Sequence, residues 1–328
     1  MQTIPEVGLG TWKIAKDKCA DAVYTAIKEV GMRHIDCACD YGNEVEVGQG
    51  IARAISEGVV KREELWITSK LWNTFHSPEH VEMACKKSLT DLGLDFVDLY
   101  LIHFPISMKF VPIETRYPPE WIHDPNAANP RIEQVKQSKQ ETWRAMEELV
   151  GKGLTRFIGV CNYNVQLLTD LIDYAKIAPF CLQVELHPYL PQQALVDVCA
   201  ANNIRVVAFS PFGGMSYVEL GVDRKVGGGL LEEEGVRAIA EKHAKTPAQV
   251  LLRWNLQRGV AVIPKSSQLV HLKENFAVSD FTIAPDDMST ISALGVQCSF
   301  QRSGRVLRIY GWSHSHLRLG KVLYDVQL

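Results

Sequence analysis

Residues 33–44 read RHIDCACDYGNE, in which a short apolar strand ends in a carboxylate, Asp36, and a tyrosine, Tyr41, follows five residues later. Two later runs, LWITSK at 65–70 and VDLYLIH at 97–103, are also apolar and strand-like, and each also ends in a titratable side chain. Neighbouring parallel strands lie ~5 Å apart. We therefore expect these strand ends to meet in one site.

Strand-like and helix-like segments alternate along the chain. The expected strands cover residues 7–12, 33–36, 65–70, 97–103, 156–160, 181–185, 205–209 and 260–264. The expected helices cover residues 17–30, 44–56, 78–92, 137–150, 165–175, 192–202 and 247–257. Such alternation indicates parallel strands joined by helices. A doubly wound open sheet also alternates, but eight units with candidate catalytic residues at adjacent strand ends favour a closed (β/α)8 TIM barrel.

We expect a single barrel domain over residues 1–295 and an atypical C-terminal tail over residues 296–328. Two insertions interrupt the alternation, at 104–135, which is rich in proline and aromatic residues, and at 212–231. Long segments without secondary structure in a compact domain are usually lids or binding loops. Because both follow the carboxyl ends of strands, we predict that both overhang the proposed site.

Composition indicates a globular protein that acts on small molecules. The chain has 328 residues, is 46% hydrophobic and carries a net charge of −3, which suits a large core. Basic residues are dispersed before the tail, which argues against nucleic acid as a partner. The sequence has no apolar run of the ~20 residues that span a bilayer and no signal-peptide pattern at its start. We expect a cytoplasmic monomer or homodimer without membrane contact.

The eight cysteines lack the paired spacing of zinc sites. Cys37 and Cys39 flank one strand end, but no second pair of ligands accompanies them. We therefore expect reduced, buried thiols and no metal.

The residue types at the strand ends suit proton transfer. A tyrosine has a pKa of roughly 10, which is high for a proton donor at neutral pH. An adjacent ammonium stabilises the phenolate and lowers that pKa, while a carboxylate keeps the ammonium charged and oriented. Tyr41, Lys70 and Asp36 fit these roles, and we expect His103 to hydrogen-bond the substrate oxygen or relay its proton. Each residue alone has an ordinary structural explanation, but their joint occurrence at three consecutive strand ends favours catalysis.

The stretch 36–44, with SKLWN at 69–73 and LIHFP at 101–105, resembles the aldo-keto reductases, and in particular their aldose and xylose reductase branch. The resemblance runs from about Val7 to Leu294, with motifs in the family's order and spacing. In that family the four matching residues form the catalytic tetrad, and the tyrosine is the proton donor. The family usually begins with a hairpin that closes the barrel floor, and with almost nothing before Val7 we expect either an open floor or a chain that is truncated at this end. Because protein side chains do not deliver hydride, a nicotinamide cofactor is also implied.

By this resemblance a cofactor site runs along the later strand ends. Asn162 and Gln183 match the residues that bind the carboxamide, while Cys161 and Phe209 stand where the family usually has serine and tyrosine. The motif PKSS at 264–267 is expected to begin a helix directly after the eighth strand and to form an anion site for the 2′-phosphate of NADPH. The expected cofactor-binding residues are Gly10, Thr11, Trp12, Asp36, Cys161, Asn162, Gln183, Phe209, Ser210, Phe212, Lys265, Ser266, Ser267, His271, Glu274 and Asn275.

His271 is a departure, because the family has a phosphate-binding arginine there. Arginine is permanently charged and bidentate toward phosphate, whereas histidine has a reference pKa of ~6.5 and offers one contact per ring edge. We therefore expect NADPH as cofactor, with a reduced preference over NADH.

Aromatic residues are expected to form an apolar wall beside the catalytic residues. The expected substrate contacts are Trp12, Tyr41, Trp72, His103 and Phe104. The runs 109–119 and 209–220 resemble xylose reductases, which implies reduction of an aldose aldehyde such as that of D-xylose to the alditol. After residue 298 the chain departs from that branch, and Gln301 stands where the branch has a sugar-binding asparagine. Two alternatives therefore stay open: a general aldehyde or ketone reductase, and a cofactor-binding regulatory barrel with little turnover.

Overall fold

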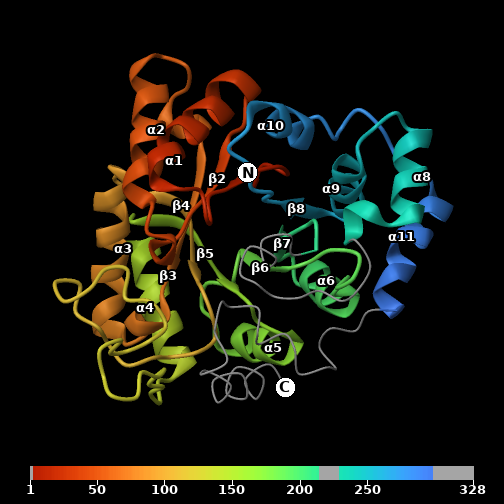
Figure 1. Cartoon of the computed structure of the whole chain (residues 1–328). Coiled ribbons are helices and arrows are strands. Elements are labelled where there is room, and N and C mark those ends of the chain that lie inside the picture. The colour runs from red at the N-terminus through yellow and green to blue at the C-terminus, as the bar shows by residue number, and fades with distance from the viewer. Residues whose placement is uncertain (1–2, 214–228, 298–328) are drawn as a thin grey trace.

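The computed structural model describes residues 3–213 and 229–297, in which eight strands alternate with helices (Figure 1). The strands pair in parallel in sequence order, from β1 to β8. They are β1 (Leu9–Gly10), β2 (His34–Asp36), β3 (Trp66–Leu71), β4 (Val97–Ile102), β5 (Thr155–Cys161), β6 (Cys181–Glu185), β7 (Arg205–Phe209) and β8 (Val260–Val262). The parallel order places all carboxyl ends at the same edge of the sheet.

The segment that leads into β1 also pairs with β8. The amide of Gly8 donates to the carbonyl of Val262 at 2.8 Å, and the amide of Val262 donates to the carbonyl of Glu6 at 2.8 Å. Further along, the amide of Gly10 donates to the carbonyl of Pro264 at 3.1 Å. The first and last strands of the sheet are therefore connected through their backbones.

Helices follow the strands and cover their outer face (Figure 1). The helices are α1 (Lys16–Thr25), α2 (Glu44–Ser56), α3 (Pro78–Leu92), α4 (Lys139–Gly151), α5 (Val165–Tyr174), α6 (Gln193–Ala201), α8 (Glu234–Lys242), α9 (Pro247–Gln257), α10 (Leu269–Phe276) and α11 (Pro285–Gln297). A π-helical turn, Ala26–Val30, continues α1, and short 3-10 turns cover Cys39–Tyr41, Arg62–Glu64, Asn73–Phe75 and Leu230–Glu232. None of the helices in the described ranges is long and apolar enough to cross a membrane.

Most element bounds agree with the sequence prediction. Helices α2, α3 and α9 and strands β6 and β7 have the predicted bounds. The expected strand at 7–12 is reduced to the two residues of β1, and α10 begins at Leu269 rather than directly after β8. Helices α8 and α11 were not predicted. In α8 only Val236, Ile239 and Ala240 are buried, so its apolar stripe is narrow and its sequence is otherwise polar.

Aromatic side chains cover the amino ends of the strands. The ring of Phe157 stacks on Trp66 with centroids 5.5 Å apart and on Phe180 with centroids 4.1 Å apart. Ile4 is buried and packs in the same cluster. The open floor expected from the sequence is thus filled by these side chains.

A buried carboxylate ties three strands together near the same end. Asp98 on β4 is fully buried, and its Oδ2 accepts hydrogen bonds from Nη2 of Arg62 at 2.8 Å and from the amide of Ile67 at 2.9 Å. Its Oδ1 accepts from Nη1 of Arg156 at 2.7 Å. Both guanidinium groups also lie over the ring of Phe96, at 4.1 and 4.3 Å from its centroid.

We predict that Asp98→Asn lowers the free energy of unfolding by about 3 kcal/mol, because it removes a buried negative charge that accepts hydrogen bonds from Arg62, Arg156 and the Ile67 amide. Urea unfolding followed by circular dichroism measures this change. The matched control is Glu133→Gln, which breaks the more exposed ion pair with Lys109 and is expected to leave stability nearly unchanged. Equal effects of the two substitutions would contradict the structural role of Asp98.

Candidate active site

The four predicted catalytic residues lie at adjacent carboxyl ends of the sheet. Asp36 ends β2, Lys70 lies near the end of β3, and His103 directly follows β4. Tyr41 lies on the 3-10 turn Cys39–Tyr41 that follows β2. The turn ends at Gly42, whose φ of 68° is a left-handed conformation that favours glycine. This local geometry returns the chain toward the strand ends.

The ammonium of Lys70 connects these side chains. Its Nζ donates to Oδ1 of Asp36 at 2.6 Å, to the hydroxyl of Tyr41 at 3.1 Å and to the carbonyl of Cys37 at 2.9 Å. Lys70 and Asp36 are at most 1% exposed. The ring of His103 meets the ring of Tyr41 edge-on, with centroids 5.8 Å apart. The structure thus brings the four residues together.

Burial and charge set the protonation of the tyrosine and the lysine. Burial raises the pKa of Tyr41 above its usual value, and the charge of Lys70 offsets only part of that rise. The sequence predicted that Lys70 lowers the pKa of Tyr41, and it does so. Burial, which raises that pKa, has the larger effect. For Lys70 itself, burial lowers the pKa, yet Asp36 and Tyr41 raise it above its ordinary value on balance. At neutral pH the site therefore holds a neutral phenol against a charged ammonium.

His103 is held neutral. Burial lowers the pKa of His103 well below its usual value, and the positive charge of Lys70 lowers it further. The ring stacks on Phe104 with centroids 4.8 Å apart and meets Trp72 edge-on at 5.2 Å. A neutral imidazole carries one N–H donor. Of the two roles expected for His103, hydrogen bonding to the substrate oxygen fits this neutral state better than relaying a proton.

Gln183 reaches the same carboxylate from β6. Its Nε2 donates to Oδ2 of Asp36 at 2.7 Å, and both residues are buried. The neighbouring Asn162 donates its amide to the carbonyl of Gln183 at 3.0 Å and its side-chain Nδ2 to the carbonyl of His103 at 2.8 Å. Both residues were predicted to bind a cofactor, but their contacts with Asp36 and His103 were not predicted. These hydrogen bonds tie the later strands to the first four.

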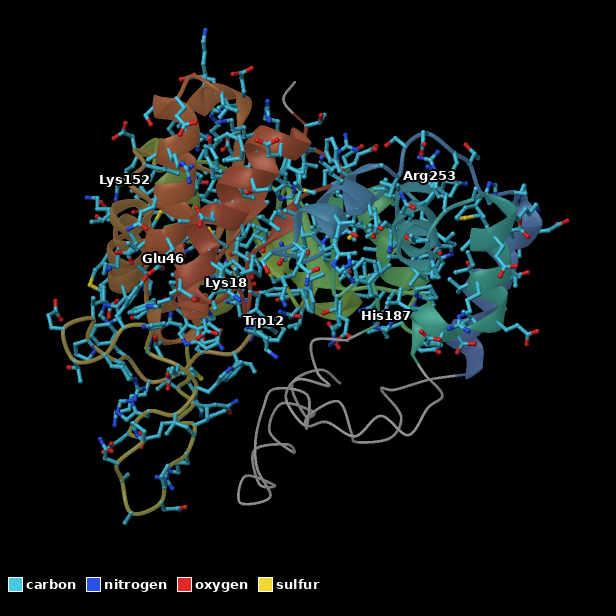
Figure 2. All side chains as sticks on the ribbon, turned by 45° about the horizontal axis from the view of Figure 1, so that its top comes forward. Trp12, Lys18, Glu46, Lys152, His187 and Arg253 are labelled. Atoms are coloured by element: carbon cyan, nitrogen blue, oxygen red, sulfur yellow. The ribbon has the colours of Figure 1, made fainter. Side chains whose placement is uncertain are left out.

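Aromatic rings form a wall beside Tyr41. The Trp12 and Tyr41 ring centroids are 6.5 Å apart, and Figure 2 shows Trp12 on the side of the molecule from which residues 104–138 extend. The indole Nε1 of Trp72 donates to the carbonyl of Glu120 at 3.1 Å. This hydrogen bond connects the insertion at 104–135 to the site. Phe104 completes the predicted wall, with its ring centroid 5.9 Å from that of Trp72.

Sequence reasoning missed two residues near the site. Trp121 packs edge-on against Trp72 at 4.9 Å and near Phe104 at 5.1 Å. The sequence did contain a signal for Trp121, because the insertion at 104–135 that includes it is rich in aromatic residues. Glu44 is buried on α2 and accepts hydrogen bonds from the hydroxyls of Ser69 at 2.6 Å and Ser88 at 2.9 Å. It stood in the quoted motif, but nothing in the sequence pointed to its two serine partners.

The remaining predicted cofactor residues fall into two groups. Near the site, Thr11 donates its hydroxyl to the carbonyl of Asp36 at 3.0 Å. Other members of that group lie at strand ends or just beyond them, and they are Gly10, Cys161, Phe209, Ser210 and Phe212. The second group lies on the loop before α10 and on α10 itself, and it comprises Lys265, Ser266, Ser267, His271, Glu274 and Asn275. The hydroxyl of Ser266 accepts from the amide of Gln268 at 3.1 Å, just before α10 begins.

The residue types in these groups fit a nicotinamide dinucleotide. Side-chain amides stand beside the catalytic residues, and the half-buried ring of Phe209 offers a stacking surface. Lys265 and Ser267 are exposed near the start of α10, where backbone amides favour an anion. The expected xylose-reductase run at 216–220 and Gln301 lie outside the described residues, as does the tail from residue 298.

The cysteines near the site are protonated thiols. Burial raises the pKa of Cys37 and of Cys39 well above the usual value. The seven cysteines within residues 3–213 and 229–297 are free and buried. Across that part of the chain no cluster of three histidine, cysteine or acidic side chains is arranged to hold a metal ion.

Comparisons with known proteins identify the relatives of this chain. A probable NAD(P)H-dependent D-xylose reductase of Emericella nidulans is 52% identical over 292 residues, covering 89% of this chain and 90% of that protein. The NAD(P)H-dependent D-xylose reductase of Aspergillus niger is 51% identical over 292 residues, with the same coverage. The solved structure of the aldose reductase from Schistosoma japonicum superposes with a TM-score of 0.80 at 36% identity, covering 96% of this chain and 95% of that one.

The family pattern described as Aldo/keto reductase family matches residues 6–295, which include every described strand. The resemblance seen in the motifs is therefore confirmed along nearly the whole described chain. This protein belongs to the aldo/keto reductase family.

Proposed function

We propose that this enzyme uses NAD(P)H to reduce the aldehyde of an aldose such as D-xylose to the corresponding alditol. The relatives at 51–52% identity carry the name D-xylose reductase, and the chain is an NAD(P)H-dependent oxidoreductase of their family. The 3.1 Å contact between the Lys70 ammonium and the Tyr41 hydroxyl carries the proposal, because it pairs a neutral proton donor with a fixed positive charge.

The same proposal extends to the architecture. The chain comprises a single closed (β/α)8 barrel domain over residues 1–295 and an atypical C-terminal sequence over residues 296–328. Support for closure comes from the backbone hydrogen bonds between β8 and the segment at Glu6–Gly10. The enzyme works in the cytoplasm as a monomer or homodimer on small aldehydes or sugars. The free cysteine thiols of the described residues suit a reducing compartment.

The cofactor would be held by the two groups of residues at the strand ends and on α10. Asn162 and Gln183 would bind the carboxamide, Phe209 would lie against the nicotinamide ring, and Lys265 with Ser266 would bind the 2′-phosphate of NADPH. When bound, the reduced nicotinamide supplies the hydride for the carbonyl carbon. The protein orients the substrate, excludes water and supplies the proton.

Proton donation is assigned to Tyr41. As negative charge develops on the carbonyl oxygen, the Tyr41 hydroxyl passes its proton to that oxygen. The phenolate that remains is stabilised by the Lys70 ammonium, which Asp36 keeps in place. The neutral imidazole of His103 donates a hydrogen bond to the same oxygen and orients the carbonyl.

A general aldehyde reductase is the second candidate. The apolar wall of Trp12, Trp72 and Phe104, extended by Trp121, suits an aromatic aldehyde at least as well as a sugar. A regulatory barrel with little turnover has less support, because the four catalytic side chains stand in contact distance.

We predict that Tyr41→Phe lowers kcat by about 10³-fold, because the carbonyl oxygen loses its positioned proton donor. NADPH affinity, measured by quenching of intrinsic fluorescence, is expected to stay nearly unchanged. Tyr24→Phe is the control, since this tyrosine of α1 is not among the site residues and its hydroxyl donates to Glu57 at the C-terminal end of α2. Loss of NADPH binding together with activity would show instead that Tyr41 has a structural role.

We predict only a modest preference for NADPH over NADH, because the imidazole of His271 offers phosphate one contact per ring edge where the family has a bidentate guanidinium. His271→Arg should raise the preference for NADPH, since a guanidinium is permanently charged and bidentate toward phosphate. The ratio of kcat/KM for the two cofactors measures this preference, with Lys273→Arg on the same helix as control. A strong preference for NADPH in the unmodified enzyme that His271→Arg leaves unchanged would contradict this prediction.

A further inference from the structure

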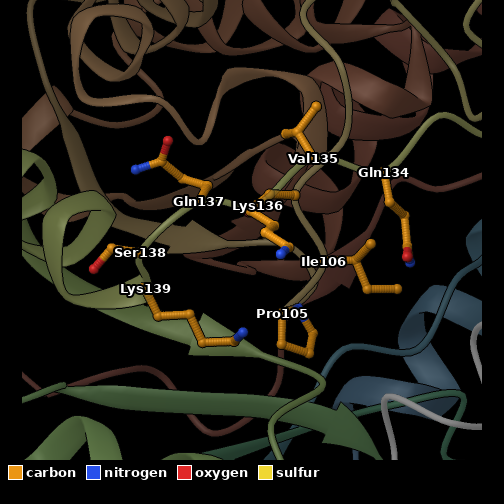
Figure 3. A pocket seen from close by; sticks show the side chains of 9 residues that line it. Pro105, Ile106, Gln134, Val135, Lys136, Gln137, Ser138 and Lys139 are labelled. Atoms are coloured by element: carbon orange, nitrogen blue, oxygen red, sulfur yellow. The ribbon is translucent and has the colours of Figure 1, made fainter.

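A pocket lies outside the site described above, between the segment after β4 and the start of α4 (Figure 3). Its volume is about 480 Å³, within the range of small-molecule sites. Its lining residues are Pro105, Ile106, Ser107, Gln134, Val135, Lys136, Gln137, Ser138 and Lys139. None of these residues belongs to the proposed catalytic or cofactor machinery.

The walls of the pocket are fixed by hydrogen bonds. The amide of Val135 donates to the carbonyl of Ser107 at 3.0 Å, which holds the two lining segments side by side. The hydroxyl of Ser138 caps α4 by accepting from the amide of Glu141 at 3.3 Å. At the base, the hydroxyl of Ser107 bonds Nδ1 of the buried His76 at 3.0 Å. The pocket is therefore a built feature of the loop and not a gap between mobile side chains.

The pocket is positively charged. Figure 3 shows the amino groups of Lys136 and Lys139 extending over it toward Pro105 and Ile106. Within the described ranges neither lysine forms an ion pair, whereas the nearby Glu133 is paired with Lys109 at 3.0 Å. The pKa of His76 is lowered to about 3, mainly by burial and secondly by the positive charge of Lys139. The lining residues thus carry two positive charges and no negative one, and the nearby carboxylate of Glu141 accepts a hydrogen bond from Nε2 of Gln137 at 3.2 Å.

We infer that this pocket binds the phosphate monoester of a small organic molecule, with the phosphate between Lys136 and Lys139. Lysine binds phosphate as a compact point charge, and the adjacent first turn of α4 adds a favourable dipole for an anion. The volume exceeds that of phosphate alone, and Pro105 and Ile106 offer an apolar floor for the carbon portion. Sugar phosphates and glycerol phosphates have this chemistry.

The position of the pocket connects it to the loop that lines the proposed substrate wall. Pro105 directly follows Phe104, whose ring stacks on His103. A bound phosphate ester would therefore contact the chain segment that carries the wall. The pocket is separate from Lys265–Ser267, so one enzyme can hold a cofactor and the phosphate ester together.

Isothermal titration of the full chain with glycerol 2-phosphate tests this inference. Neither glycerol nor its phosphate has a carbonyl group to be reduced, and saturation with NADPH fills the cofactor's own phosphate site without starting a reaction. We expect one equivalent of glycerol 2-phosphate to bind, and the Lys136→Ala/Lys139→Ala double variant to weaken its binding by about tenfold or more. Glycerol itself should not bind measurably.

The matched control is Lys16→Ala/Lys18→Ala, which removes the same charge from two exposed lysines of α1. It should bind glycerol 2-phosphate as tightly as the unmodified chain. Equal weakening by both double variants would mean that only net charge matters, and unchanged binding by the pocket variant would place the phosphate elsewhere. Inorganic phosphate that binds as tightly as the ester would overturn the assignment of an organic ligand. These outcomes do not depend on whether the enzyme reduces sugars.

Discussion

A buried ammonium is the constraint on which the site depends. Lys70 is fully buried, and a charge in that environment is strongly unfavourable unless each of its donors is satisfied. Its three N–H groups meet the Asp36 carboxylate, the Cys37 carbonyl and the Tyr41 hydroxyl. These partners come from β2 and the turn after it. The position of Lys70 therefore requires β2 and β3 to be parallel neighbours in the register observed.

The same environment separates the charge states of the site. Burial keeps the phenol of Tyr41 and the imidazole of His103 neutral, while Asp36 keeps Lys70 charged. The neutral phenol of Tyr41, the neutral imidazole of His103 and the charged ammonium of Lys70 thus lie close together. This arrangement suits an oxygen that becomes negative during reaction, because stabilisation is available without reorganisation of the protein.

Local patterns explain which features were predictable. Pro78 and Gly93 mark the ends of α3, and short apolar runs define β6 and β7. The catalytic residues were found because each stands at the end of a strand or within a few residues of it. The bond from Gln183 to Asp36 spans 147 positions between strands that are not neighbours, so no local pattern encodes it. The aromatic floor was missed for the same reason, since its rings come from β3, β5 and the residue before β6.

The account is tested most directly by NADPH oxidation with D-xylose and, separately, with an aromatic aldehyde, using the full chain. We predict turnover of D-xylose, because the proton-donating contacts are complete and close relatives are named for this sugar. Turnover of the aromatic aldehyde alone would move the assignment to a general aldehyde reductase. Tight NADPH binding without turnover of either substrate would contradict the central claim that Tyr41, Lys70 and Asp36 form a working proton donor.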